Sequence, residues 1–135
     1  KTGECIPAHP DFMLVISYNP GYQSVLKDLK QSTRQRFVGM QFDYPPADRE
    51  AAIVAMEGSV APDMAERLVA LAGKIRNVRE QGLTEGASTR LLIYAAQLIR
   101  LGIPPAQACR TALCLPLTDD DRLQETLGAL IEDLF

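Results

Sequence analysis

Two short apolar runs in the first third of the chain are typical of buried β-strands. Residues 12–18, Phe-Met-Leu-Val-Ile-Ser-Tyr, are almost continuously apolar, the pattern of a strand covered on both faces in a parallel sheet. Residues 37–44 place apolar side chains at every second position, which is the period of a strand. Because two such strands cannot form a stable sheet alone, we expect further strands upstream of this chain.

Beyond Pro45-Pro46 the apolar positions change to the three- and four-residue spacing of amphipathic helices. We expect a short helix over residues 47–56, and a longer one after Pro62 whose apolar stripe runs from Met64 to Val78. Ser88 or Thr89 is predicted to cap a third helix. The sequence thus predicts an all-α domain from residue 47 onward.

Two more helices are expected in the last third of the chain. Pro104-Pro105 opens a helix over residues 106–115, which Pro116 ends. Thr118 is predicted as the N-cap of a fifth helix, with three aspartates in its first turn, where they favour the helix dipole. The layout is the end of an α/β domain over residues 1–46, with two strands of an incomplete sheet, followed by a helical domain over residues 47–135.

Composition and charge narrow the classes of partner. The 135 residues are 47% apolar, and 14 Lys and Arg face 17 Asp and Glu, a net charge of −3 that does not draw nucleic acid or anionic lipid. No apolar run approaches the roughly 18 to 20 residues of a membrane span. The three cysteines form no C-x-x-C pair, so we expect neither a disulfide framework nor a metal site, and a reducing cytoplasm as the compartment.

Asn19 follows the first predicted strand directly. In open α/β sheets ligands bind beyond the carboxyl ends of the strands, so the Asn19 amide could orient a water molecule or contact a terminal phosphate. The alternative is that Asn19-Pro20-Gly21 is only a turn, since Asn and Gly suit turn conformations.

Arg34 and Arg36 lie just before the second predicted strand, and either guanidinium could bind a phosphate with two parallel hydrogen bonds. The alternatives are solvated surface arginines, or a nucleic-acid patch with Lys27 and Lys30. The patch has no aromatic interleaving or helix-turn-helix spacing to support it.

Gly86-Ala-Ser-Thr-Arg90 opens the third predicted helix. The N-terminus of a helix attracts phosphate, and an arginine in its first turns adds a full charge. The alternative is a capped helix with one exposed arginine.

The order of these three features resembles the MoxR branch of the AAA+ ATPases over nearly the whole chain. In detail the sequence is most similar to the CbbQ/NorQ group. The segments that carry this resemblance are His9-Pro-Asp-Phe12, Ile16-Ser-Tyr-Asn-Pro-Gly-Tyr22, Ser32-Thr-Arg-Gln-Arg-Phe37, Phe42-Asp-Tyr-Pro-Pro46 and Gly86-Ala-Ser-Thr-Arg90.

The resemblance implies the C-terminal portion of a P-loop AAA+ core followed by a helical lid. It implies that Asn19 is the sensor 1 residue and Arg90 the sensor 2 arginine, both directed at the nucleotide. An arginine finger for the neighbouring subunit belongs before the second strand, where Arg36 fits better than Arg34; a finger is worth ~10³ to 10⁵ in rate. Residues 1–4 would end the pre-sensor hairpin.

Two motifs of the family are absent from the sequence. It contains no G-x-x-x-x-G-K-[ST] loop and no apolar strand ending in Asp-Glu. We expect these motifs, which hold ATP and Mg²⁺, N-terminal to Lys1, so this chain alone is predicted neither to bind ATP tightly nor to hydrolyse it.

The resemblance also implies partners. A finger acting in trans requires a homo-oligomer, expected to be a hexameric ring. CbbQ-type proteins act with a von Willebrand factor A domain partner to release inhibited Rubisco, and NorQ-type proteins serve nitric oxide reductase; the CbbQ role is favoured here. The alternative from another class is a non-enzymatic helical adaptor that holds a partner helix on the stripe from Met64 to Val78.

Overall fold

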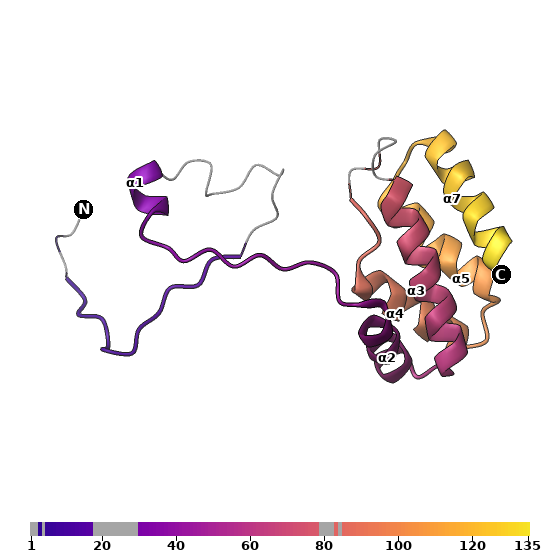
Figure 1. Cartoon of the computed structure of the whole chain (residues 1–135), viewed down its shortest axis with the longest axis horizontal. Coiled ribbons are helices and arrows are strands. Elements are labelled where there is room, and N and C mark those ends of the chain that lie inside the picture. Colours follow the sequence, from indigo (N-terminus) through magenta and orange to yellow (C-terminus); the bar gives the residue numbers. More distant parts are fainter. Residues whose placement is uncertain (1–2, 4, 18–29, 79–82, 84) are drawn as a thin grey trace. The chain divides into compact units, whose positions relative to one another are not determined.

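The computed structural model describes residues 3, 5–17, 30–78, 83 and 85–135. The chain divides into two units, Lys1–Gln41 and Phe42–Phe135, which are described separately below (Figure 1). The predicted domain boundary at residue 46 stays a prediction about the whole protein.

Among the described residues of the first unit, the one regular element is the single helical turn α1 (Gln31–Arg34). The two predicted strands are wrong: residues 12–17 and 37–44 form no strand and no sheet, and Tyr18 lies outside the described residues. Their apolar side chains are exposed, Phe12 to 67% and Val38 to 94%. The physical reason is that a strand is held by hydrogen bonds to its neighbours and by cover on its faces, and the described residues supply neither to these segments.

The second unit is helical, as predicted for the lid. It consists of α2 (Ala47–Gly58), α3 (Pro62–Asn77), α4 (Thr89–Arg100), α5 (Pro105–Cys109), the π-helical segment η2 (Arg110–Cys114), α6 (Leu115–Leu117) and α7 (Asp121–Leu134). The single helix predicted over residues 106–115 is a run of three elements that includes Pro116. Pro116 has no N–H to donate to the preceding turn, and the widened π-helical turn lies directly before it.

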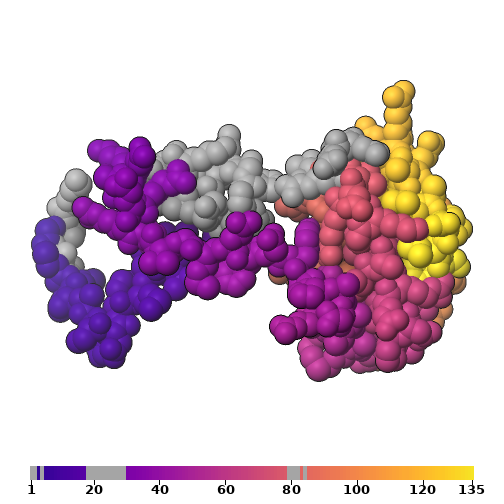
Figure 2. Space-filling view, viewed as in Figure 1, coloured from indigo at the N-terminus to yellow at the C-terminus, as the bar shows by residue number. Residues whose placement is uncertain are grey.

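The helices pack around one hydrophobic core. α3 lies between α2 and α7 (Figures 1 and 2), and α4 packs against α2 and the α5–η2 run. The stripe predicted on α3 faces this core, where Leu68, Leu71 and Ile75 are completely buried. Gly58 at the end of α2 lies against Ala96 of α4, so the two helices approach closely at that point.

The helix ends follow local rules, with one correction. Gly102, at φ +90°, ends α4 with a Schellman motif, in which the N–H of Ile103 donates to Leu98 O at 3.1 Å. The N-cap of α7 is Asp120 and not Thr118: its carboxylate accepts from the backbone N–H of Leu123 at 3.0 Å. The Thr118 hydroxyl instead accepts from the N–H of Asp120, so two of the three aspartates precede the helix.

Candidate functional site

Glu50 is a charged residue inside the helical unit. It lies on the core-facing side of α2 with Ala51 and Val54, and only 1% of its surface is exposed. A buried carboxylate is strongly unfavourable unless a cation and hydrogen-bond donors surround it. The groups that surround the Glu50 carboxylate are therefore important for the stability of this part of the domain.

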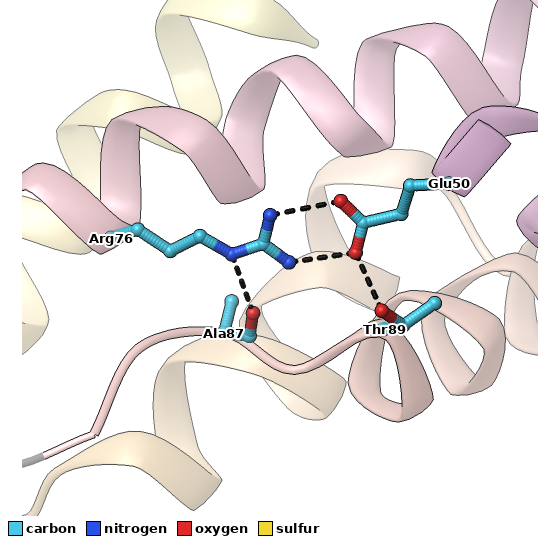
Figure 3. Close-up of polar contacts among 4 residues, drawn as sticks. All are labelled: Glu50, Arg76, Ala87 and Thr89. Carbon is cyan, nitrogen blue, oxygen red and sulfur yellow. Dashed lines mark hydrogen bonds and ion pairs between the residues drawn. The ribbon is translucent and has the colours of Figure 1, made fainter. Parts of the chain in front are cut away.

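Arg76, near the end of α3, supplies the cation. Its Nη1 donates to Glu50 Oε2 at 2.8 Å and its Nη2 to Glu50 Oε1 at 2.7 Å, a bidentate pair (Figure 3). Burial raises the pKa of Glu50, but hydrogen bonds from Arg76 and Thr89 and the charge of Arg76 outweigh it, so the net pKa lies below its ordinary value. The pair is ionised at neutral pH.

The same two residues hold the segment that opens α4. Arg76 Nε donates to the backbone carbonyl of Ala87 at 2.9 Å, and the Thr89 hydroxyl donates to Glu50 Oε1 at 2.7 Å (Figure 3). We refer to Glu50, Arg76, Ala87 and Thr89 as the Arg76 network. Because Ala87 and Thr89 stand on either side of Ser88, the network fixes the turn into α4 from both sides.

Two further residues pack on the network. The guanidinium carbon of Arg76 lies 3.6 Å from the centre of the Tyr44 ring, a cation–π contact. A Cβ added to Gly86 would lie 3.0 Å from both Arg76 Cγ and the Tyr44 hydroxyl. Gly86 is therefore the residue that lets the backbone pass this close to the stacked pair.

Arg90 is the second residue of α4, and its side chain is exposed. It makes no hydrogen bond or ion pair with any other residue that the structure describes. The Ser88 side chain makes no capping hydrogen bond, so the first N–H groups of α4 are not occupied by it. The N–H groups of Leu91 and Leu92 donate to Ser88 O, whereas those of Thr89 and Arg90 have no acceptor among the described residues. These two groups and the exposed guanidinium of Arg90 favour an anion such as phosphate.

The other predicted site residues are placed differently. Asn19 lies outside the described residues. Arg34 ends α1 and Arg36 follows it, both exposed, in the first unit. Since Arg90 belongs to the helical unit, the joint action of these residues stays a prediction. The nucleic-acid patch also includes Lys27, which is not described.

The sequence reasoning missed Glu50 and Arg76. A signal was present for Glu50, because it falls on the same helical face as Ala51, Val54 and Gly58. A charged residue in an apolar stripe indicates a buried partner. Nothing local indicated that the partner would be Arg76, 26 residues away.

Neither a metal-binding group nor a membrane-spanning helix is found within the described residues. No group of three acidic, histidine or cysteine side chains there could hold a metal ion. No helix of that part of the chain is both long and apolar enough to span a membrane.

The fold and the site together define a class: a small helical domain in which a buried ion-pair network presents an exposed arginine in the first turn of a helix. Comparison with known proteins gives the particular family. The family described as "CbbQ/NirQ/NorQ C-terminal" matches residues 50–134, and the chain belongs to this family.

Three relatives align with all or nearly all of the chain. It is 53% identical over 135 residues to "Protein CbbQ" of Hydrogenophilus thermoluteolus and 53% over 135 residues to "Protein NorQ" of Paracoccus denitrificans. It is 53% identical over 132 residues to "Denitrification regulatory protein NirQ" of Pseudomonas aeruginosa. The chain covers 100%, 100% and 98% of its own length in these matches, but only 51%, 50% and 50% of the relatives. It therefore spans about half the length of the curated relatives it matches.

Proposed function

We propose that the helical unit is the lid of an AAA+ ATPase and that Arg90 contacts the phosphates of ATP. The observation that carries this proposal is the Arg76 network, which holds the backbone on both sides of Ser88 and leaves the Arg90 guanidinium exposed. Functional residues need supporting contacts on rigid elements, and the Arg76 network provides such contacts to the turn just before Arg90.

Two further roles complete the proposed nucleotide site. Asn19 is proposed to contact the terminal phosphate and the attacking water, and Arg36 to act as the finger toward a neighbouring subunit, with Arg34 as the alternative. The exposure of Arg34 and Arg36 is compatible with a contact to another subunit. ATP and Mg²⁺ would be held mainly by residues outside this chain.

For the whole protein we propose ATP-driven remodelling of a client protein in the cytoplasm, by a hexameric ring acting with a von Willebrand factor A domain partner. CbbQ-type activation of Rubisco is the client role that we propose first. NorQ-type activation of nitric oxide reductase is the alternative, and the identities of 53% to both CbbQ and NorQ favour neither.

The burial of the α3 stripe removes the surface that the adaptor alternative requires. It required the stripe from Met64 to Val78 for a partner helix, but the central residues of that stripe, Leu68, Leu71 and Ile75, are completely buried in the domain's own core. No observation in the described residues favours it.

The test of the nucleotide role uses the full-length protein. Arg90→Ala is expected to weaken ATP binding by about 10- to 100-fold, the loss of one charge-assisted hydrogen-bonding group. Arg100→Ala is the matched control, because Arg100 is an exposed arginine at the other end of α4. Equal nucleotide affinity in both variants would reject Arg90 as a phosphate ligand.

The finger is tested by comparing Arg36→Ala with Arg34→Ala. The true finger variant is expected to bind nucleotide normally and to lose about 10³-fold or more of the turnover rate. Mixing it with a subunit whose own nucleotide site is disabled should restore part of the turnover, because the intact finger is then supplied in trans. Full turnover in both single variants would contradict the proposal.

A further inference from the structure

Arg76 joins two segments that are far apart in the sequence. Its face stacks on Tyr44, which stands immediately before Pro45-Pro46 and α2, and its Nε donates to the carbonyl of Ala87, which precedes Ser88, the N-cap of α4. The segment that precedes α2 and the segment that precedes α4 thus both contact the Arg76 side chain.

The guanidinium of Arg76 has little freedom to move independently of these contacts. All three of its nitrogens donate hydrogen bonds, to Glu50 Oε1, Glu50 Oε2 and Ala87 O, at 2.7, 2.8 and 2.9 Å. Its side chain is only 16% exposed. A planar group held at its edge by three hydrogen bonds and on its face by a ring must move with them as one body.

Tyr44 is tied to the start of α2 as well. Pro45 and Pro46 restrict the backbone after it, and the Pro46 carbonyl accepts the N–H of Glu50 at 2.8 Å in the first turn of the helix. Because Glu50 is also the partner of Arg76, both ends of the segment from Tyr44 to Glu50 contact the same guanidinium. A displacement of the Tyr44 ring therefore acts on Arg76 directly.

Gly86 adds a second contact between these segments. Its α-carbon lies so close to Arg76 and the Tyr44 hydroxyl that an added Cβ would be 3.0 Å from each. The backbone just before Ala87 thus leaves no room for a side chain beside the stacked pair. Tyr44, Arg76 and the 86–89 backbone form a continuous packed path that ends one residue before Arg90.

We propose that Arg76 is a positioning residue that couples the placement of Tyr44 to the nucleotide contact of Arg90. The position of segment 42–46 would then influence the position of the α4 N-terminus. Binding of phosphate at Arg90 would in return favour the stacked position of Tyr44. This inference rests on the proposed role of Arg90.

A double-mutant cycle in the full-length protein tests the coupling. Tyr44→Leu removes the ring, and is expected to weaken binding of a non-hydrolysable ATP analogue by about three- to tenfold, the size of a cation–π contact. In the Arg90→Ala background the same change should leave the affinity unaltered, because the group that it positions is gone. Tyr44→Phe retains the ring and should bind the analogue like the unchanged protein.

The outcomes separate the two proposals. If Tyr44→Leu weakens binding by the same factor with and without Arg90, the loss is a general one and the coupling is overturned, while the role of Arg90 stands. If Arg90→Ala alone leaves the affinity unchanged, the proposed function fails first. Thermal melting establishes that each variant is folded. If Tyr44→Leu unfolds, Arg76→Lys replaces it in the cycle, because lysine keeps the charge but lacks the bidentate guanidinium.

Discussion

The guanidinium of Arg76 and the carboxylate of Glu50 meet in two parallel hydrogen bonds of 2.7 and 2.8 Å, inside a domain where Glu50 is 1% exposed. Glu50 is the sole polar or charged residue among the fully buried side chains of the described chain. Its counter-charge among the described residues comes from α3, so the pair joins α2 to α3, and through Thr89 to α4.

Removing the cation should be costly. Arg76→Ala would leave the Glu50 carboxylate buried without a counter-charge, and we expect the free energy of unfolding to fall by about 3 to 5 kcal/mol. Arg49→Ala, at the exposed neighbouring position, is the control and should change stability by no more than about 0.5 kcal/mol. Urea unfolding followed by circular dichroism measures both, and a similar small change in the two variants would contradict a structural role for the pair.

The pair should also give the domain an acid-sensitive stability. The folded-state pKa of Glu50 lies below the ordinary value of 4.5, so its ionised form stabilises the fold at higher pH. That contribution is present above the unfolded-state pKa and is lost as the pH falls through the folded-state pKa. The stability difference between the unchanged protein and Glu50→Gln should therefore be largest near neutral pH and shrink below about pH 4.5. A difference that stays constant down to pH 3 would rule out Glu50 as the titrating group.

Two helical glycines should respond to alanine in opposite ways. A Cβ on Gly58 would overlap with the Cβ of Ala96, so Gly58→Ala must push α2 and α4 apart, at a cost of about 1 to 3 kcal/mol. A Cβ on Gly73, within α3, would meet nothing within 4 Å. Gly73→Ala should therefore raise stability by roughly 0.5 to 1 kcal/mol, the gain in helix propensity. Melting temperatures that shift in the same direction in both variants would contradict the close α2–α4 packing.

The cysteines should differ sharply in reactivity. Burial raises the pKa of the Cys109 thiol to about 12 and also raises that of Cys114, whereas Cys5 is exposed. Since the thiolate is the reactive form, Cys109 and Cys114 should resist alkylation near pH 8 in the folded protein. Mass spectrometry of iodoacetamide-treated protein is expected to find label on Cys5 first, and on all three at similar rates in denaturant. Rapid labelling of Cys109 without denaturant would mean that the core opens.

The sequence by itself determined the helices, because their signals are local. The spacing of Met64, Leu68, Leu71 and Ile75 identifies one helical face, and the core faces that side of α3. The motifs from His9 to Arg90 likewise indicated the family, to which the comparisons assign residues 50–134.

Only the tertiary structure decided which groups meet. The partners of Glu50 are 26 and 39 residues away, and no periodicity encodes a contact at such a separation. The two predicted strands failed for the complementary reason: their pattern is typical of buried strands, but a strand exists only where neighbouring chain supplies hydrogen bonds and cover. Helices satisfy their backbone within a few residues, whereas a buried ion pair and a β-strand depend on what the rest of the fold brings beside them.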